Sequence, residues 1–190
     1  MENLIKACRS YRRFLENEPI SPSELTGLIE LARLAGSARN AQPLRYLIVT
    51  SPDYRERLFP LLGWAGYLSD WPGPGAGERP TAYIVCLEDR RINGDAVFDL
   101  GIASQNILLG AIARGIGGCR IASFAKKKVA ELFDLDEHLS PSLVIALGRP
   151  AEEVIIEETD DPDEIKYWRD ENQRHHVPKL TTGKLVIGAF

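Results

Sequence analysis

Arg9-Ser10-Tyr11-Arg12-Arg13-Phe14 places three guanidinium groups and a serine hydroxyl within five residues near the start of the chain. A second stretch, Ser37-Ala38-Arg39-Asn40-Ala41-Gln42-Pro43, leads into the apolar run Tyr46-Leu47-Ile48-Val49. Guanidinium groups bind phosphate oxygens in a bidentate way, and amide side chains offer donors and acceptors to the edge of a polar ring. Either stretch alone is more often a solvated helix face or a plain loop. Together they indicate a planar cofactor that carries a phosphate.

The composition predicts one globular domain that spans residues 1–190. The apolar fraction of 44% and the charged fraction of 26% are ordinary for a soluble protein, and the net charge of −4 argues against a nucleic-acid partner. No stretch approaches the ~20 apolar residues of a membrane span. The start, Met1–Lys6, lacks the basic and apolar regions of a secretory signal. Cys8, Cys86 and Cys119 are widely spaced and odd in number, which is typical of free thiols in the cytoplasm.

Local patterns predict helices and strands in an irregular order. Ser21-Pro22-Ser23-Glu24 has the N-cap, the first-turn proline and the acidic residue of a capping box, and Gly36 stands where a C-cap is expected. Further helices are expected over 53–62, 99–114 and 124–133, and strands over 46–50, 82–87, 121–122, 143–147 and, at a sheet edge, 154–156. Because no regular βαβ rhythm emerges, the predicted class is α+β.

The two opening stretches resemble the nitroreductase family of FMN-dependent flavoproteins. That family begins with Arg-Arg-Ser-x-Arg-x-Phe and continues with Pro-Ser-x-x-Asn-x-Gln-Pro-Trp. Three further stretches fit the family's central helix, the Gly-rich turn after it and a closing strand end: 99–109, Gly115-Ile116-Gly117-Gly118-Cys119 and Ala146-Leu147-Gly148-Arg149-Pro150. The resemblance implies a nitroreductase-like fold, in which a central, mostly antiparallel sheet is flanked by helices. It also implies a homodimer that exchanges a terminal arm.

This chain departs from the family pattern at several positions. Cys8 stands where many members have the first Arg, so one phosphate contact is either absent or moved to Arg9 or Arg13. Gly36 replaces Pro, Ala38 replaces a second Ser of some members, and Leu44 replaces Trp.

The resemblance assigns candidate contacts to FMN. Ser10 and Arg12 match the phosphate contacts best, whereas Arg9 and Arg13 are adjacent alternates. Lys179 resembles a basic residue of the family that reaches the phosphate, although a lone lysine is equally often solvated. The complete set is Arg9, Ser10, Arg12, Arg13, Ser37, Asn40, Gln42, Gly117, Gly118 and Lys179.

Two other groups of side chains invite a functional interpretation. Trp64, Tyr67 and Trp71 lie on a loop rich in glycine and proline, and they form either a lid over a flat substrate or a loop pinned by buried tryptophans. His175-His176 suggests a metal site, but adjacent side chains diverge and no third ligand has zinc spacing, so no metal is expected.

The resemblance implies an oxidoreductase in which NAD(P)H reduces the flavin and the flavin then reduces a small acceptor in the same place. The flavin supplies the redox chemistry, so no side chain is assigned as catalytic. Nothing in the sequence distinguishes a nitroaromatic, a quinone or an enone as the acceptor. Two alternatives stay open: a protein that binds or sequesters flavin without turnover, and a family variant with dehalogenase or flavin-fragmenting chemistry.

Overall fold

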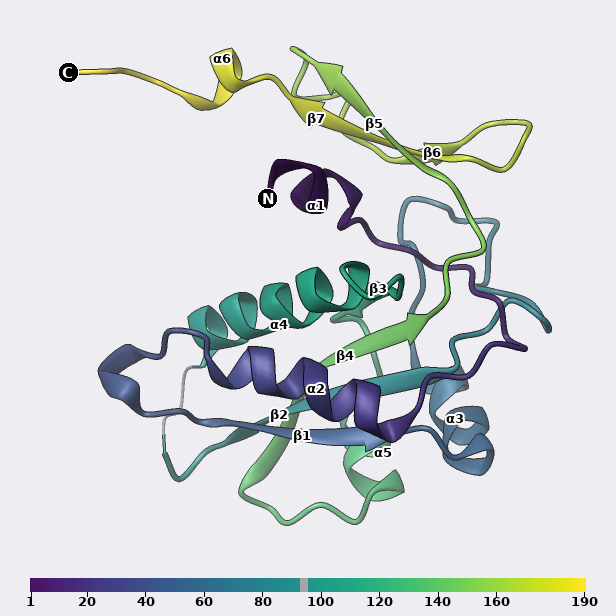
Figure 1. Ribbon diagram of the computed structural model, residues 1–190, viewed down its shortest axis with the longest axis vertical. Helices are drawn as coiled ribbons and strands as arrows, with labels where there is room; N and C mark the ends of the chain where they lie inside the picture. The colour runs from purple at the N-terminus through teal and green to yellow at the C-terminus, as the bar shows by residue number, and fades with distance from the viewer. Residues whose placement is uncertain (93–95) are drawn as a thin grey trace.

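A four-stranded antiparallel sheet forms the centre of the molecule, with strand order β1-β2-β4-β3 (Figure 1). We describe residues 1–92 and 96–190 of a computed structural model. The strands are β1 (Leu44–Val49), β2 (Ala82–Asp89), β3 (Gly117–Ile121) and β4 (Leu139–Gly148). The two inner strands, β2 and β4, are short runs of apolar residues, as expected for strands that are covered on both faces.

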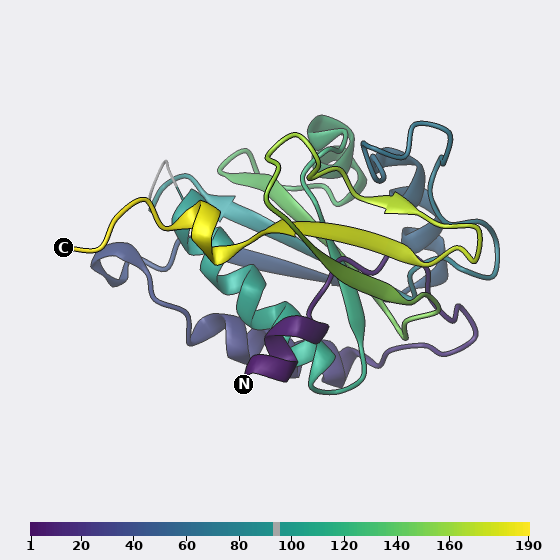
Figure 2. The same cartoon turned by 90° about the horizontal axis from the view of Figure 1, so that it is seen from above.

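Helices cover both faces of this sheet. Two of them lie on one face and two on the other, and a short helix at the N-terminus lies beside the longest one (Figures 1 and 2). The first pair is α2 (Pro22–Arg33) and α4 (Val97–Ile112), the second is α3 (Pro52–Leu58) and α5 (Lys126–Leu132), and the N-terminal helix is α1 (Glu2–Ala7). Two 3₁₀ turns of the described chain lie between α2 and β1, at Ala38–Asn40, and directly after α3, at Phe59–Leu61.

The core follows from the alternation of side chains along β2. Ile84 and Cys86 pack with α2 and α4, whereas Tyr83 and Val85 pack on the opposite face with α3 and α5. Successive residues of a strand point to opposite faces, so a continuous apolar run supplies both halves of the core. The α+β class, with a central antiparallel sheet flanked by helices, is thereby confirmed.

A second, smaller sheet lies above α1 and α4 (Figures 1 and 2). Its strand order is β5-β7-β6, with β5 parallel and β6 antiparallel to β7. The strands are β5 (Val154–Thr159), β6 (Trp168–Arg169) and β7 (His175–Leu180), followed by a short helix, α6 (Thr182–Leu185). The edge strand predicted at 154–156 is confirmed as the start of β5, which lies in this second sheet.

The side chain of His176 ties the three small strands together. Its ring stacks on Trp168 of β6 with centroids 4.1 Å apart, and its Nδ1 lies 2.7 Å from Glu157 Oε1 of β5. Its Nε2 lies 3.3 Å from Asp170 Oδ2. Burial acts against the charged ring, but these two hydrogen bonds prevail and raise the pKa of His176.

Two local predictions need correction. The capping box of Ser21 and Glu24 is confirmed, but α2 ends at Arg33 with Leu34 as its cap, so Gly36 is not the C-cap. The expected Gly-rich turn is shorter than predicted. Only Gly115 lies in it, with a φ of +70°, while Gly117 and Gly118 already belong to β3.

Within residues 1–92 and 96–190, we find no helix with the length and apolar character needed to cross a membrane.

Candidate cofactor site

The arginine-rich segment follows α1 as an extended chain that is clamped against the main sheet. Ser10 forms a bridge with Gly118 of β3, and the Tyr11 N–H donates to the Gly118 carbonyl at 3.1 Å. Phe14 is fully buried and forms a second bridge with Pro150, just after β4. Extended geometry sends neighbouring side chains to opposite sides, so Arg12 and Arg13 diverge.

Glu152 fixes the backbone of this segment. Its Oε1 accepts hydrogen bonds from the main-chain N–H groups of Arg12 and Arg13. Its Oε2 accepts from Arg169 Nη2 at 2.9 Å, and both side chains of this ion pair are buried. A buried carboxylate with three donors is well satisfied, and removing it would leave a buried positive charge without a partner.

A cavity of about 310 Å³ opens between this segment, α4, β3 and β7. Four positively charged side chains line it: Arg9, Arg12, Arg120 and Lys179. Among the described residues that line it, none carries a carboxylate. In a chain with a net charge of −4, such a concentration of positive charge indicates an anionic ligand.

Arg12 is the most constrained of these four side chains. It is only 9% exposed, and its guanidinium carbon lies 4.9 Å from the centre of the Tyr167 ring. Its Nη1 donates to the Ser10 carbonyl at 3.3 Å and to His175 Nε2 at 3.0 Å. Arginine can only donate, so Nε2 of His175 must be the acceptor.

His175 therefore carries its proton on Nδ1 and is uncharged at neutral pH. Burial, together with the neighbouring charges of Arg12 and Arg169, lowers its pKa from 6.5 to about 4. The ring is 1% exposed, and Nδ1 has no hydrogen-bond partner among the described residues. A buried donor without a partner is costly and is typical of a site that a ligand completes.

Arg13 points away from this cavity. Its Nε lies 3.3 Å from Glu78 Oε2, and its Nη2 donates to Gln173 Oε1 at 3.1 Å. The structure thus brings Arg9, Ser10, Arg12 and Lys179 together and separates Arg13 from them.

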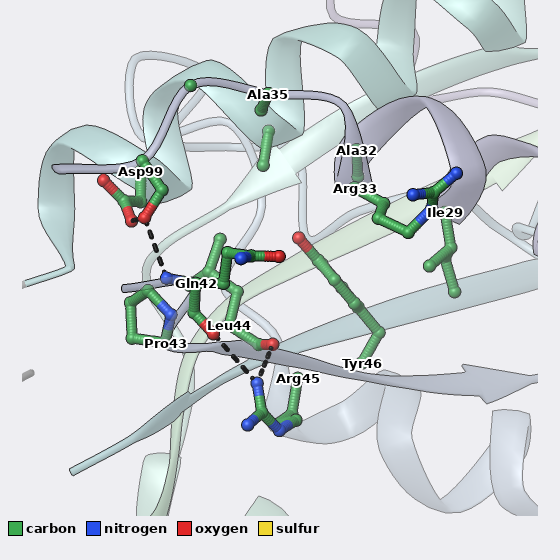
Figure 3. Close-up of a pocket in the computed structure, with 13 residues that line it drawn as sticks. Ile29, Ala32, Arg33, Ala35, Gln42, Pro43, Leu44, Arg45, Tyr46 and Asp99 are labelled. Atoms are coloured by element: carbon green, nitrogen blue, oxygen red, sulfur yellow. Dashed lines mark hydrogen bonds between the residues drawn. The ribbon is translucent and has the colours of Figure 1, made fainter. Parts of the chain in front are cut away.

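Ser37 and Gln42 line a different cavity, of about 260 Å³, between α2, β1 and the start of α4 (Figure 3). The Ser37 hydroxyl donates to Asp99 Oδ2 at 2.6 Å and accepts from the Gln42 N–H at 2.9 Å. Arg39, Asn40 and Gln42 all have φ between 51° and 55°. Three non-glycine residues in the left-handed region are strained, which is typical of a loop shaped for binding.

The two cavities lie on different sides of α4. Asp99 and Ala103 line the cavity that contains Ser37 and Gln42. Gln105 and Leu108 line the cationic cavity. At 100° per residue, positions 103 and 105 point in nearly opposite directions. Within a single chain, Ser37 and Gln42 therefore do not lie next to Arg12.

Gly117 and Gly118 do not line the cationic cavity but lie in β3, where Gly118 pairs with Ser10. Both are buried, and a Cβ on Gly118 would come within 2.5 Å of Leu108 and 2.8 Å of Leu147. A Cβ on Gly117 would lie 2.9 Å from the ring of Tyr11. The absence of side chains here lets the arginine segment lie directly against β3, which places Ser10 at the cavity.

The tryptophans of the aromatic loop pack against neighbouring side chains. Trp64 packs against Phe59 and, edge-on, against Trp71, and Arg169 stacks over Trp71 at 4.2 Å. These tryptophans hold the loop in place. Tyr67 is 55% exposed, and its ring lies 4.9 Å from Tyr167, which lines the cationic cavity.

Sequence reasoning missed Arg120 and Tyr167, and it considered His175 only as a metal ligand. Arg120 was detectable in principle, because it is the single charged residue of the strand Gly117–Ile121 and alternation places it on the face opposite Cys119. Tyr167 and His175 lie on segments with no matching motif, and only the second sheet brings them to the cavity.

Comparisons with known proteins agree with this architecture. The model of the nitroreductase family matches residues 5–149. A protein of Methanothermobacter thermautotrophicus, named as a candidate NADH dehydrogenase/NAD(P)H nitroreductase, is 33% identical over 168 residues, covering 85% of this chain and 83% of the relative. An FMN reductase (NADPH) of Bacillus subtilis is 23% identical over 167 residues, covering 80% and 67% of the two chains.

Among solved structures, an FMN-dependent nitroreductase of Clostridium difficile R20291 superimposes with a TM-score of 0.65. It is 22% identical and the match covers 80% of this chain and 89% of that one, which supports the fold. The matched family model spans the arginine segment, the strained loop, the central helix and the closing strand, so this chain belongs to the nitroreductase family.

Proposed function

We propose that this protein is an FMN-dependent oxidoreductase that uses NAD(P)H. The observation that carries the proposal is the cavity with four positively charged side chains and no carboxylate among its described lining residues. The names of the Clostridium difficile structure and the Bacillus subtilis relative support FMN, and those of both relatives support NAD(P)H.

The residues present fit a phosphate-bearing ligand. Arg12 is positioned by the Ser10 carbonyl and by neutral His175, so its guanidinium is oriented before any ligand arrives. Ser10 and the charge of Lys179 add polar groups around the same cavity, and the buried Nδ1–H of His175, another lining residue, has no partner among the described residues. Pre-oriented donors bind an anion more tightly because little conformational entropy is lost on binding.

When bound, FMN would supply the redox chemistry, which is hydride transfer between NAD(P)H and a small planar acceptor. The protein binds and orients it. Tyr67 and Tyr167 offer flat surfaces beside the cavity against which a planar molecule packs. We assign no side chain as nucleophile or general acid, and the acceptor is a nitroaromatic, a quinone or an enone.

We further propose a homodimer in which the cavity of one chain meets the strained loop of its partner. Ser37 and Gln42 line the cavity on the other side of α4 from Arg12, and Asn40 lies in the loop between them, so we propose that they reach the same flavin from a second chain. The three cysteines are buried and unpaired, which fits the reducing cytoplasm in which we place this activity.

The test is to purify the protein and to identify the flavin that it releases on denaturation. We expect FMN, because the cationic cavity offers binding groups for one terminal phosphate and we recognise no adenine pocket among residues 1–92 and 96–190. Recovery of FAD, or of no flavin after reconstitution with excess FMN, would refute the proposal. Adding NADH without oxygen should bleach the visible absorption; FMN that stays oxidised would indicate a binding protein without turnover.

A further inference from the structure

Arg120 is held over the cationic cavity by two side chains of α4. Its Nε donates to Ser104 Oγ at 2.8 Å, and its Nη2 donates to Gln105 Oε1 at 2.6 Å. A guanidinium has five N–H donors, so these two bonds leave three without a partner among the described residues. The group is therefore fixed in place and still able to bind an anion through a bidentate pair.

Gln105 connects Arg120 to Cys8. Because its Oε1 faces Arg120, its Nε2 is directed to the Cys8 sulfur, at a distance of 3.8 Å. Cys8 occupies the position where the family pattern has its first arginine, and it lines the same cavity. Burial raises the pKa of Cys8, so its thiol is uncharged and offers no charge to a phosphate.

The other candidates for the missing contact are less suitable. Arg13 is engaged by Glu78 and Gln173 outside the cavity. Arg9 lines the cavity, but its Nη2 donates to the Ile5 carbonyl of α1, and its Nε is buried without a partner. Arg120 is joined to Cys8 through the side chain of Gln105, and its Nη1 group makes no hydrogen bond with the described residues.

We propose that Arg120 is a phosphate ligand of the bound flavin, and that it supplies from β3 the positive charge that Cys8 does not supply from the N-terminal segment. The inference rests on the FMN site proposed above and adds to it a residue outside the family's arginine motif. It also gives a function to the contacts that join Arg120, Gln105 and Cys8. Gln105 keeps the guanidinium close to Cys8, where the family pattern has an arginine.

The experiment compares the affinities for FMN and for riboflavin, which differ only in the phosphate. Both are measured by fluorescence quenching on the protein stripped of flavin. Arg120→Ala should lower FMN affinity roughly tenfold or more and leave riboflavin affinity nearly unchanged. Arg57→Ala is the matched control, since it removes one positive charge from an exposed pair with Asp53, away from the cavity.

Two further variants make the outcome decisive. Arg120→Lys should retain part of the preference for FMN, and adding Cys8→Arg to Arg120→Ala should restore it. Unchanged riboflavin affinity verifies that each variant is folded. An FMN preference that survives Arg120→Ala, or one that is lost only in Arg9→Ala, would overturn the inference while leaving the proposed function intact. A wild-type protein that binds neither flavin would overturn both.

Discussion

Arg12 and Arg13 are neighbours in the chain, but their guanidinium groups serve different parts of the molecule. Arg12 is directed to His175 and the cavity, whereas Arg13 is directed to Glu78 and Gln173. Glu152 accepts from both main-chain N–H groups and so fixes the backbone from which the two side chains diverge.

Arg12→Ala should therefore weaken FMN binding more than Arg13→Ala does. A charge-assisted hydrogen bond contributes roughly 1.5–3 kcal/mol, which corresponds to a loss of about 10- to 100-fold in affinity. Titration calorimetry with FMN measures both variants, and Arg13→Ala serves as the control for general loss of charge. Small and equal losses would mean that the arginine segment is a solvated face.

His175 should make the protein less stable in acid. Its pKa is lowered from 6.5 to about 4, so the unfolded chain takes up a proton before the folded one as the pH falls. The stability due to the neutral ring is present above pH 6.5 and is lost as the pH falls toward 4. Urea unfolding across this range should show that His175→Gln loses less stability than the wild type.

His176 provides an internal comparison for this measurement. Its pKa is raised by hydrogen bonds to Glu157 and Asp170, so its contribution is present at low pH and is lost as the pH rises through the folded-state pKa. Glu157→Gln should reduce the loss of stability that His176 causes as the pH rises. It should not change the loss of stability that His175 causes as the pH falls. Parallel pH profiles for wild type and His175→Gln would contradict the assignment of a neutral His175.

At the scale of elements, the start of α2 offers the clearest test of local stability. Ser21 Oγ accepts from the Glu24 N–H at 3.3 Å, and Glu24 Oε2 accepts from the Ser21 N–H at 2.9 Å. Ser21→Ala should lower the free energy of unfolding by about 1 kcal/mol, because the Glu24 N–H loses its side-chain acceptor.

Ser51→Ala is the matched control for Ser21→Ala. Ser51 is the N-cap of α3 and also precedes a proline, but its side chain makes no capping hydrogen bond. The substitution should change the free energy of unfolding by less than about 0.5 kcal/mol. Chemical denaturation measures both variants, and equal effects would show that the capping box contributes nothing specific.

At the scale of the whole molecule, the exposed apolar side chains include a group on α4 and a group at the end of the chain. On α4, Phe98 is 81% exposed and Ile102 is 47% exposed. At the end of the chain, Leu185 is 65% exposed, and Ile187 and Phe190 are fully exposed. Exposed apolar groups of this extent are typical of a surface that another chain covers.

Deleting residues 180–190 should loosen the proposed homodimer and lower FMN occupancy at the same time. A flavin that binds only the assembled state stabilises that state by mass action, so the two properties are coupled. Light scattering and the ratio of flavin to protein absorbance measure them together. A comparison variant that replaces Leu185, Ile187 and Phe190 with serine keeps the length of the chain and should behave like the deletion. A full-length protein that behaves as a 21.1 kDa monomer and keeps its flavin would contradict the proposed homodimer.

The sequence by itself determined the α+β class, the capped start of α2, the apolar strands and the family, because these depend on local periodicity, capping chemistry and motifs. It identified Ser10, Arg12 and Lys179, which the structure places at one cavity. Periodicity did not reveal where a helix ends without a glycine cap, and therefore Gly36 was misassigned.

Only the tertiary structure decided which of the motif residues meet. Arg120, Tyr167 and His175 reach the cavity because β3 and the second sheet bring segments from distant parts of the chain to α4. It also separated Ser37 and Gln42 from Arg12 by the width of α4. Such contacts depend on how packed elements are oriented, and the spacing of residues along one chain carries no information about that orientation.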